Sequence, residues 1–176
     1  MNQTSSNITV SVIIVSWNAR EYLRQCLASL LDETCRYPME IIVVDNASSD
    51  GSADCVANSY PNVRLIRNAE NVGFAKANNI GVSASTGSYL CFVNSDVKVL
   101  PLCLSRLVEY GEKNQKAGIV GPRITGGDGN LQRSCRGFPT VWNMFCRHIQ
   151  ALHRMWSEWK RRLLYSLPDR SYCRLY

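Results

Sequence analysis

The 176-residue sequence contains no uninterrupted run of 18 apolar residues, so no segment has the composition of a membrane-spanning helix. Its first nine residues lack the basic start and apolar stretch of a secretory signal. None of its eight cysteines belongs to a C-x-x-C pair, which argues against a zinc site. With 45% hydrophobic and 19% charged residues, the sequence predicts one globular cytoplasmic domain with reduced thiols.

Most of the sequence also lacks an excess of charge of either sign. The net charge is +6, but residues 1–139 are nearly balanced. Residues 140–176 hold seven Lys and Arg against two Asp and Glu. Because the basic character is confined to this end, we expect no nucleic-acid partner.

Glycine-rich phosphate-binding loops are absent as well. The first β-rich run, residues 10–15, leads into Ser16-Trp17-Asn18 rather than into the glycines of a dinucleotide-binding turn. No G-x-x-x-x-G-K-[ST] motif occurs, which excludes a P-loop. A dinucleotide or flavodoxin-like fold that uses Asp45 to bind a ribose remains only as a minor alternative.

The hydrophobic pattern alternates between the two kinds of secondary structure. It predicts strands over residues 10–15, 40–44, 63–66 and 89–93, and helices over 20–31, 53–58, 73–84 and 102–113. This order predicts an α/β fold with a Rossmann-like, mostly parallel sheet sandwiched by helices and joined by right-handed crossovers. The run at 90–93 has no polar alternation, which predicts a strand buried on both faces.

Polar residues follow three of the predicted strands. They are Trp17-Asn18, Asp45 and Asn94-Ser95-Asp96, and parallel strands bring their carboxyl ends to one edge. Asp45 suits a hydrogen bond to a base or ribose, and Asp96 suits a Mg²⁺ or Mn²⁺ ion that bridges a diphosphate. Alternatively, Asn94-Ser95-Asp96 only turns the chain or caps a helix.

Four segments in this order resemble the motifs of the family 2 glycosyltransferases. They are Val10 to Asn18, Ile41 to Ser52, Glu70 to Gly81, and Asn94-Ser95-Asp96. The sequence is most similar to the bacterial rhamnosyltransferase-like branch, which residues 118–123, 128–132 and 136–139 also match. The resemblance covers about residues 8–140 and implies an incomplete fold of the GT-A type.

The resemblance also implies which residues surround a nucleotide-sugar donor, namely a UDP- or dTDP-sugar. Asp96 takes the last position of the family's D-x-D motif and would hold a divalent metal, Mg²⁺ or Mn²⁺, whereas the first position is Asn94 in place of Asp. The implied donor-binding residues are Val15, Ser16, Trp17, Asn18, Asp45, Asn46, Gly73, Phe74, Asn78, Asn79, Asn94, Ser95 and Asp96.

The reaction that the resemblance implies is metal-dependent transfer of the sugar to a cell-surface polysaccharide or lipid-linked acceptor, with inversion. The family's general base belongs to an acidic motif that has no counterpart here, so the catalytic residue is unknown. We therefore expect a chain truncated before the base, with residues 1–139 as the donor-binding part. The alternative is a non-catalytic nucleotide-sugar-binding fragment or an interaction module.

The segment 140–167 has a separate character. Apolar residues three and four positions apart predict a basic, tryptophan-rich amphipathic helix: Trp142, Phe145, Ile149, Leu152, Trp156, Trp159 and Leu163. One interpretation is that this helix packs on the domain or on its missing half. The other is that it lies on the inner face of the cell membrane, with residues 168–176 as a tail. The sequence leaves the oligomeric state open.

Overall fold

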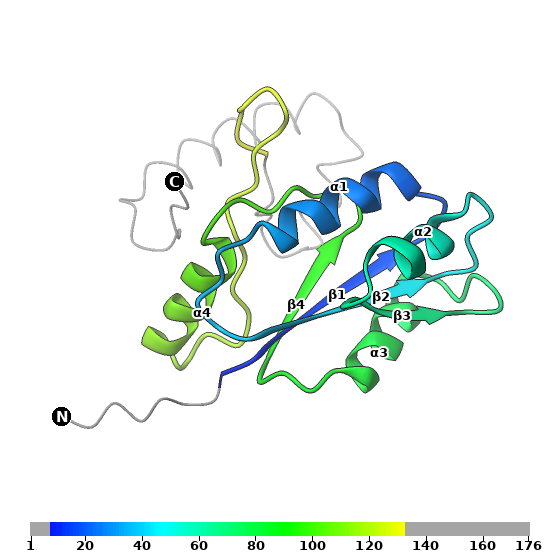
Figure 1. Cartoon of the computed structure of the whole chain (residues 1–176). Coiled ribbons are helices and arrows are strands. Elements are labelled where there is room, and N and C mark those ends of the chain that lie inside the picture. Colours follow the sequence, from blue (N-terminus) through cyan, green and yellow to red (C-terminus); the bar gives the residue numbers. More distant parts are fainter. Residues whose placement is uncertain (1–7, 133–176) are drawn as a thin grey trace, which may run out of the picture. The chain divides into compact units, whose positions relative to one another are not determined.

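The predicted alternation of strands and helices is confirmed in the computed structural model, which describes residues 8–132 (Figure 1). The chain forms two compact units, residues 1–118 and 119–176, and the first contains every named element. These are β1 (Val10–Ser16), α1 (Arg20–Leu31), β2 (Met39–Asp45), α2 (Ser52–Ser59), β3 (Arg64–Arg67), α3 (Phe74–Ala84), β4 (Tyr89–Asn94) and α4 (Cys103–Lys113).

The four strands form one parallel sheet in the order β3-β2-β1-β4. Their carboxyl ends therefore lie at the same edge, as the arrowheads in Figure 1 show. The central strand β1 sets the register on both sides, because Ser16 pairs with Asp45 of β2 and Val15 pairs with Asn94 of β4. The predicted fold class is thereby confirmed.

The main core lies on the face of the sheet covered by α1, α2 and α4. Alternate residues of a strand point to the same face, which is why Val10, Val12 and Ile14 of β1 all face this core. The helices contribute Leu23, Cys26, Leu27 and Leu30 from α1, Val56 from α2, and Leu104 and Val108 from α4.

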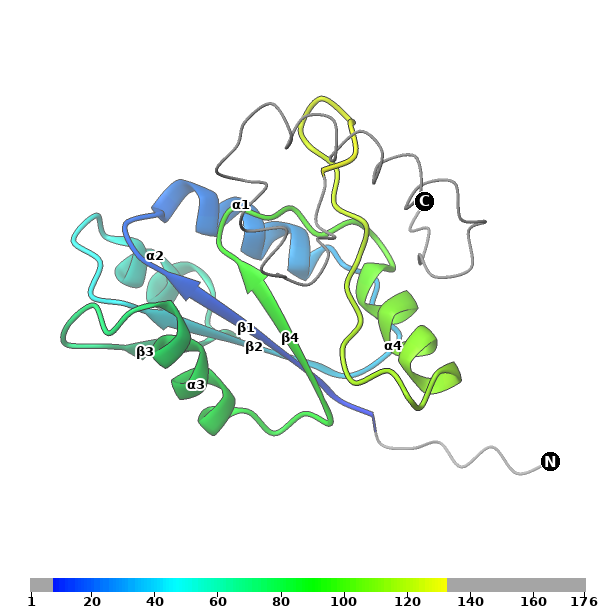
Figure 2. The ribbon, with the colours of Figure 1, turned by 180° about the vertical axis from the view of Figure 1, so that it is seen from behind.

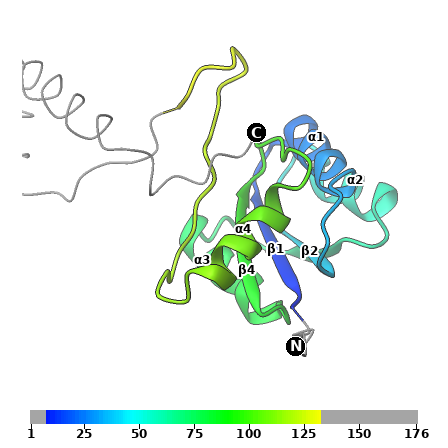
Figure 3. The same ribbon diagram turned by 90° about the vertical axis from the view of Figure 1, so that its left-hand side faces the viewer.

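Helix α3 covers the opposite face, as the end-on view in Figure 3 shows. Its buried residue Ala77 packs with Ile42 and Val44 of β2. A Cβ atom on Gly81 would lie 2.5 Å from Cγ2 of Ile13, closer than atoms can approach. The glycine therefore lets α3 pack directly on β1 and β2.

The prediction that residues 90–93 are buried on both faces is wrong. Leu90 is 43% exposed and Phe92 is 54% exposed, whereas Tyr89, Cys91 and Val93 pack on the main core. β4 is the edge strand, and α3 lies over β1 and β2 rather than over β4, as the view from behind shows (Figure 2). This strand therefore carries exposed apolar surface on its second face.

A carboxylate network closes the amino edge of the sheet. Glu40 accepts hydrogen bonds from the Ser11 hydroxyl at 2.5 Å and from the Thr86 N–H at 2.6 Å. The Gly87 N–H in turn donates to the Ser11 hydroxyl at 2.7 Å. These bonds join β1 and β2 to the loop between α3 and β4.

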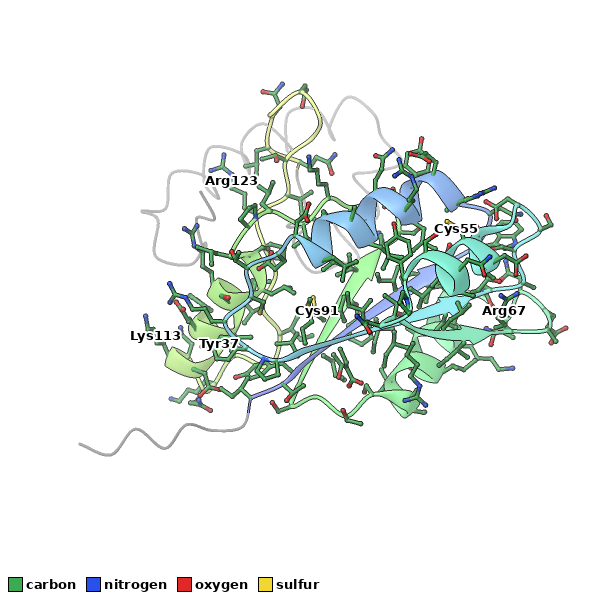
Figure 4. All side chains as sticks on the ribbon, in the orientation of Figure 1. Tyr37, Cys55, Arg67, Cys91, Lys113 and Arg123 are labelled. Atoms are coloured by element: carbon green, nitrogen blue, oxygen red, sulfur yellow. The ribbon has the colours of Figure 1, made fainter. Side chains whose placement is uncertain are left out.

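The cysteines of the described residues are free thiols, and several lie against the core. Burial raises the pKa of Cys26 and of Cys91 to about 12 each. Figure 4 shows Cys91 within the domain, whereas Lys113 lies at its outside. These two thiols therefore act as small apolar side chains rather than as nucleophiles.

The described part of the second unit is short. Thr125 and Leu131 form an isolated antiparallel bridge around a turn, in which Gly129 has a φ of +75°. Within residues 8–132, no helix is long and apolar enough to cross a membrane. The predicted amphipathic helix over 140–167 lies outside the described residues, and the predicted domain boundary at residue 139 stays a prediction.

We expect Glu40→Gln to reduce stability in a pH-dependent way. Burial alone raises the pKa of Glu40, but hydrogen bonds from Ser11 and Thr86 outweigh it and lower the pKa from 4.5. A lowered pKa stabilises the fold above the unfolded-state value, and this stability is lost as the pH falls through the folded-state value. Urea unfolding should show a deficit of about 1–2 kcal/mol at pH 7 that shrinks below about pH 4.5.

The matched control is Glu70→Gln, because Glu70 is exposed. This variant should differ from wild type by less than about 0.5 kcal/mol at any pH. A deficit for Glu40→Gln that stays constant between pH 7 and pH 3 would contradict the proposed cause.

Candidate functional site

Two buried polar side chains end the neighbouring strands β1 and β2. Ser16 is fully buried and Asp45 is 3% exposed, and they are register partners on the face that α1 and α2 cover. Asp45 Oδ2 accepts the Ser48 N–H at 3.0 Å. The Asp45 Oδ1 atom and the Ser16 hydroxyl have no hydrogen-bond partner.

Such unsatisfied atoms are unusual, because buried polar groups in folded proteins are almost always hydrogen-bonded. The backbone carbonyls of Ser16 and Asp45 do have partners. The Asn46 N–H donates to the Ser16 carbonyl, and the Asn68 N–H donates to the Asp45 carbonyl. The site therefore contains one carboxylate oxygen and one hydroxyl that are buried and unpaired at the carboxyl edge. This is where open α/β sheets bind ligands.

The turn after β1 is fastened to the loop after β2. Asn18, in the left-handed region with a φ of +49°, accepts the Ser49 N–H on its Oδ1 at 2.8 Å. The Asn18 N–H donates to the Ser48 hydroxyl at 2.9 Å. Trp17, between this turn and β1, is 57% exposed, so its ring is open to solvent at the site.

One carboxylate, Asp50, caps two helices. Its Oδ2 accepts the Arg20 N–H at the start of α1 at 2.9 Å, and its Oδ1 accepts the Ser52 N–H at the start of α2 at 3.0 Å. The Ser52 hydroxyl also donates to Asp50. Burial raises the pKa of Asp50, but these hydrogen bonds outweigh it and lower the pKa below its ordinary value of 3.8.

Asn46 joins the end of β2 to the loop over residues 68–73. It is 2% exposed, and its Nδ2 donates to Asn71 Oδ1 at 2.6 Å. Its Oδ1 accepts two bonds, from Asn68 Nδ2 and from the Val72 N–H, both at 3.1 Å. The predicted donor contact Asn46 is therefore engaged with protein partners.

The same loop leads into α3 through Gly73. Gly73 has a φ of +84° and a ψ of 162°, a conformation that essentially only glycine adopts, and a Cβ there would meet nothing within 4 Å. Phe74 follows and is 60% exposed. Asn79 is also exposed, whereas Asn78 bonds within the helix, donating from Nδ2 to the Phe74 carbonyl at 2.9 Å.

The end of β4 contributes the third group of predicted residues. Asn94 and Asp96 are exposed, and Ser95 between them is half-buried. The Asn94 carbonyl accepts the Val97 N–H at 3.2 Å, which turns the chain. The Asp96 charge is close enough to the Cys26 thiol to add to the burial that raises its pKa.

The residues at the end of β4 provide only some of the ligands that a metal ion requires. Among residues 8–132, no three His, Cys, Asp or Glu side chains lie close enough together to bind a metal by themselves. The carboxylate of Asp96 and the amide of Asn94 provide oxygen ligands, which hard divalent cations prefer. They fit an ion whose remaining ligands come from substrate phosphates and water.

The structure thus brings the predicted residues of β1, β2 and β4 to one edge of the sheet. Val15 is half-buried on the α3 face and pairs with Asn94. The sequence analysis gave Asp50 no role of its own and missed the cap that it makes for two helices. The Asp50–Arg20 bond joins residues 30 positions apart, so no local sequence pattern predicts it.

Open parallel α/β sheets bind ligands at the carboxyl ends of their strands, and the polar groups of this chain gather at that edge. The sequence model of glycosyl transferase family 2 matches residues 11–163, so the chain belongs to this family. The resemblance found in the motifs is thereby confirmed.

Curated relatives include a rhamnosyltransferase. The chain is 30% identical over 141 residues to N-acetylglucosaminyl-diphospho-decaprenol L-rhamnosyltransferase of Mycobacterium tuberculosis. The alignment covers 74% of this chain and 46% of that protein. It is 37% identical over 111 residues to the uncharacterized glycosyltransferase YibD of Escherichia coli, covering 61% of this chain and 31% of YibD. The chain therefore spans less than half the length of these relatives.

Solved structures confirm the GT-A type of fold. TarS 1–349 of S. aureus in complex with UDP-GlcNAc matches with a TM-score of 0.62 and 23% identity over 76% of this chain and 37% of that chain. The mannosyltransferase PcManGT from Pyrobaculum calidifontis, in complex with GDP-Man and Mn²⁺, matches with a TM-score of 0.56 and 24% identity. That match covers 66% of this chain and 35% of the mannosyltransferase.

We expect Asp50→Ala to lower the free energy of unfolding by about 2 kcal/mol, because two helices lose a cap at once. Thermal or urea unfolding followed by circular dichroism measures this loss. The matched control is Asp54→Ala, which removes only an exposed ion pair to Arg67 at the start of α2 and should cost about 0.5 kcal/mol. Equal losses in the two variants would contradict the capping role.

Proposed function

We propose that this chain binds the nucleoside diphosphate of a UDP- or dTDP-sugar at the carboxyl edge of its sheet. The observation that carries the proposal is the buried Asp45 Oδ1 atom, which has no partner although it lies at the end of a central strand. A ligand N–H or O–H group at this position would satisfy it. Uracil and thymine offer such an N–H, and a ribose offers hydroxyls.

The exposed aromatic side chains suit a nucleoside bound here. Trp17 follows β1 directly beside Ser16, and Phe74 opens α3. An aromatic ring at the mouth of a polar site can stack on a base. The base would then lie against Trp17, with the ribose or the base edge bonded to Asp45.

The diphosphate would lie toward β4. Asp45 and Asn94 belong to the two strands that flank β1, with their side chains on opposite faces of the sheet, and two strand spacings separate their backbones by roughly 10 Å. Asp96 and Asn94 would hold a Mg²⁺ or Mn²⁺ ion together with the phosphate oxygens. Such an ion supplies positive charge that stabilises the departing diphosphate.

In the reaction, the acceptor hydroxyl oxygen forms a bond to the anomeric carbon, and the bond from that carbon to the diphosphate oxygen breaks. The electron pair leaves with the nucleoside diphosphate, and the hydroxyl proton passes to a base that we do not assign. In-line attack would invert the anomeric centre. The residues of this chain bind and orient the donor, which brings the reacting atoms into line.

We further propose a cell-surface polysaccharide or lipid-linked acceptor. The rhamnosyltransferase of Mycobacterium tuberculosis is named for a diphospho-decaprenol substrate, which supports an acceptor of this class. A basic segment with several tryptophans, residues 140–167, would favour contact with an anionic membrane, where such an acceptor resides.

Calorimetric titration with UDP and with dTDP, each with and without Mn²⁺, tests the donor site. We expect metal-dependent binding that weakens at least tenfold in Asp96→Ala and in Asp45→Asn. Asp32→Ala is the control, because Asp32 is an exposed residue at the other end of α1 and should leave the affinity unchanged. Binding of neither nucleotide to the wild-type chain would overturn the proposal.

Co-sedimentation with vesicles tests the membrane contact separately. The full chain should bind vesicles that contain anionic lipid more tightly than neutral vesicles. Replacing Lys160, Arg161 and Arg162 by Gln should weaken this binding about 100-fold, since each basic residue contributes about 1 kcal/mol near such a surface. Equal binding to both kinds of vesicle would rule the contact out.

A further inference from the structure

We infer that Asn46 is a positioning residue of the donor site, one that holds the loop over residues 68–73 in place without touching the nucleotide. The inference rests on the proposed function, because it concerns the site described above. It differs from the expectation that Asn46 contacts the donor directly.

The hydrogen-bonding capacity of the Asn46 side chain is nearly used up. An asparagine amide offers two N–H donors and two acceptor positions. Three of these four are occupied, by Asn71 Oδ1, by Asn68 Nδ2 and by the Val72 N–H.

Backbone N–H groups fix the orientation of both amides in this network. The Val72 N–H must point to an oxygen, so the oxygen of Asn46 faces the loop. The Gly73 N–H donates to Asn71 Oδ1 at 3.0 Å, which directs the oxygen of Asn71 toward both Gly73 and the amide nitrogen of Asn46. One buried side chain therefore joins the end of β2 to three residues of the loop.

The loop matters to the donor site at both of its ends. At its start, the Asn68 N–H bonds the carbonyl of Asp45 at 2.9 Å, so a shift there moves the backbone of the predicted base-binding residue. At its end, Gly73 leads into α3 and places Phe74 in an open position at the site. Small displacements of groups that position a ligand carry a large cost.

A double-mutant cycle separates positioning from direct contact. UDP affinity is measured with Mn²⁺ for wild type, Asn46→Ala, Asn71→Ala and the double variant. We expect each single variant to bind about tenfold more weakly, and the double variant to bind clearly less than the 100-fold more weakly that independent effects would give. Both changes remove the bond between Asn46 and Asn71, so their effects should be less than additive. Asn58→Ala is the control, since Asn58 is exposed on α2.

Amide hydrogen exchange of the unliganded chain gives the second readout. Asn46→Ala should speed exchange of the Val72 and Gly73 N–H groups, whereas Asn71→Ala should affect mainly Gly73. Additive losses of affinity, or a loss in Asn46→Ala without faster exchange at Val72 and Gly73, would overturn the inference in favour of direct contact. Unchanged affinity in Asn46→Ala would overturn it as well.

The two proposals can fail separately. If the wild-type chain binds neither UDP nor dTDP, the proposed function falls and the donor-site role of Asn46 falls with it. The exchange measurement would still decide whether Asn46 fastens the loop. If wild type binds and only the cycle fails, the donor site stands and the positioning role is rejected. Circular dichroism of Asn46→Ala checks that this variant folds. Asn71→Ala removes the same bond from an exposed residue, so the test does not depend on Asn46→Ala alone.

Discussion

The parallel pairing of β1 with a strand on each side is the constraint on which the rest of the site depends. Ser16 meets Asp45 because β1 and β2 are in register, and Val15 meets Asn94 because β1 and β4 are in register. A shift of one residue in either pair would turn the polar strand ends to the wrong face and break the apolar core as well. The main core under α1 and α2 therefore fixes the site and the fold together.

Local hydrogen bonds then convert the strand ends into a rigid site. Asn18 and Asp50 fasten the loop after β2 to the start of α1, and Asn46 fastens the end of β2 to the loop before α3. These residues bond to backbone N–H groups that would otherwise lack partners where strands end and helices begin. The loops that surround Asp45 are thus held by polar side chains, whereas the sheet beneath is held by apolar ones.

The sequence was sufficient to predict the order of strands and helices. Their hydrophobic residues recur with different periods, and polar turn residues separate one element from the next. It was also sufficient to predict that Asp45 and Asp96 lie at the carboxyl ends of two strands of one sheet, Asp96 just after its strand. It failed for β4, since an apolar run does not reveal whether a helix covers its second face, and Leu90 and Phe92 are exposed. Nor could it assign the partners of Asn46, because three-dimensional proximity alone joins it to Asn71.

Backbone conformation adds a further reason to see the site as pre-organised. Ala47 has a φ of +62° and Asn18 a φ of +49°, and both belong to the turns that meet beside Asp45. A left-handed conformation costs a residue with a Cβ atom about 1–2 kcal/mol, so it persists only where surrounding bonds impose it. Those bonds are present, because the Ser48 N–H donates to Asp45 across Ala47 and the Ser49 N–H donates to Asn18. The strain at Ala47 is therefore offset by the same hydrogen bonds that hold Asp45 Oδ2, which leaves Oδ1 in a fixed position for a ligand.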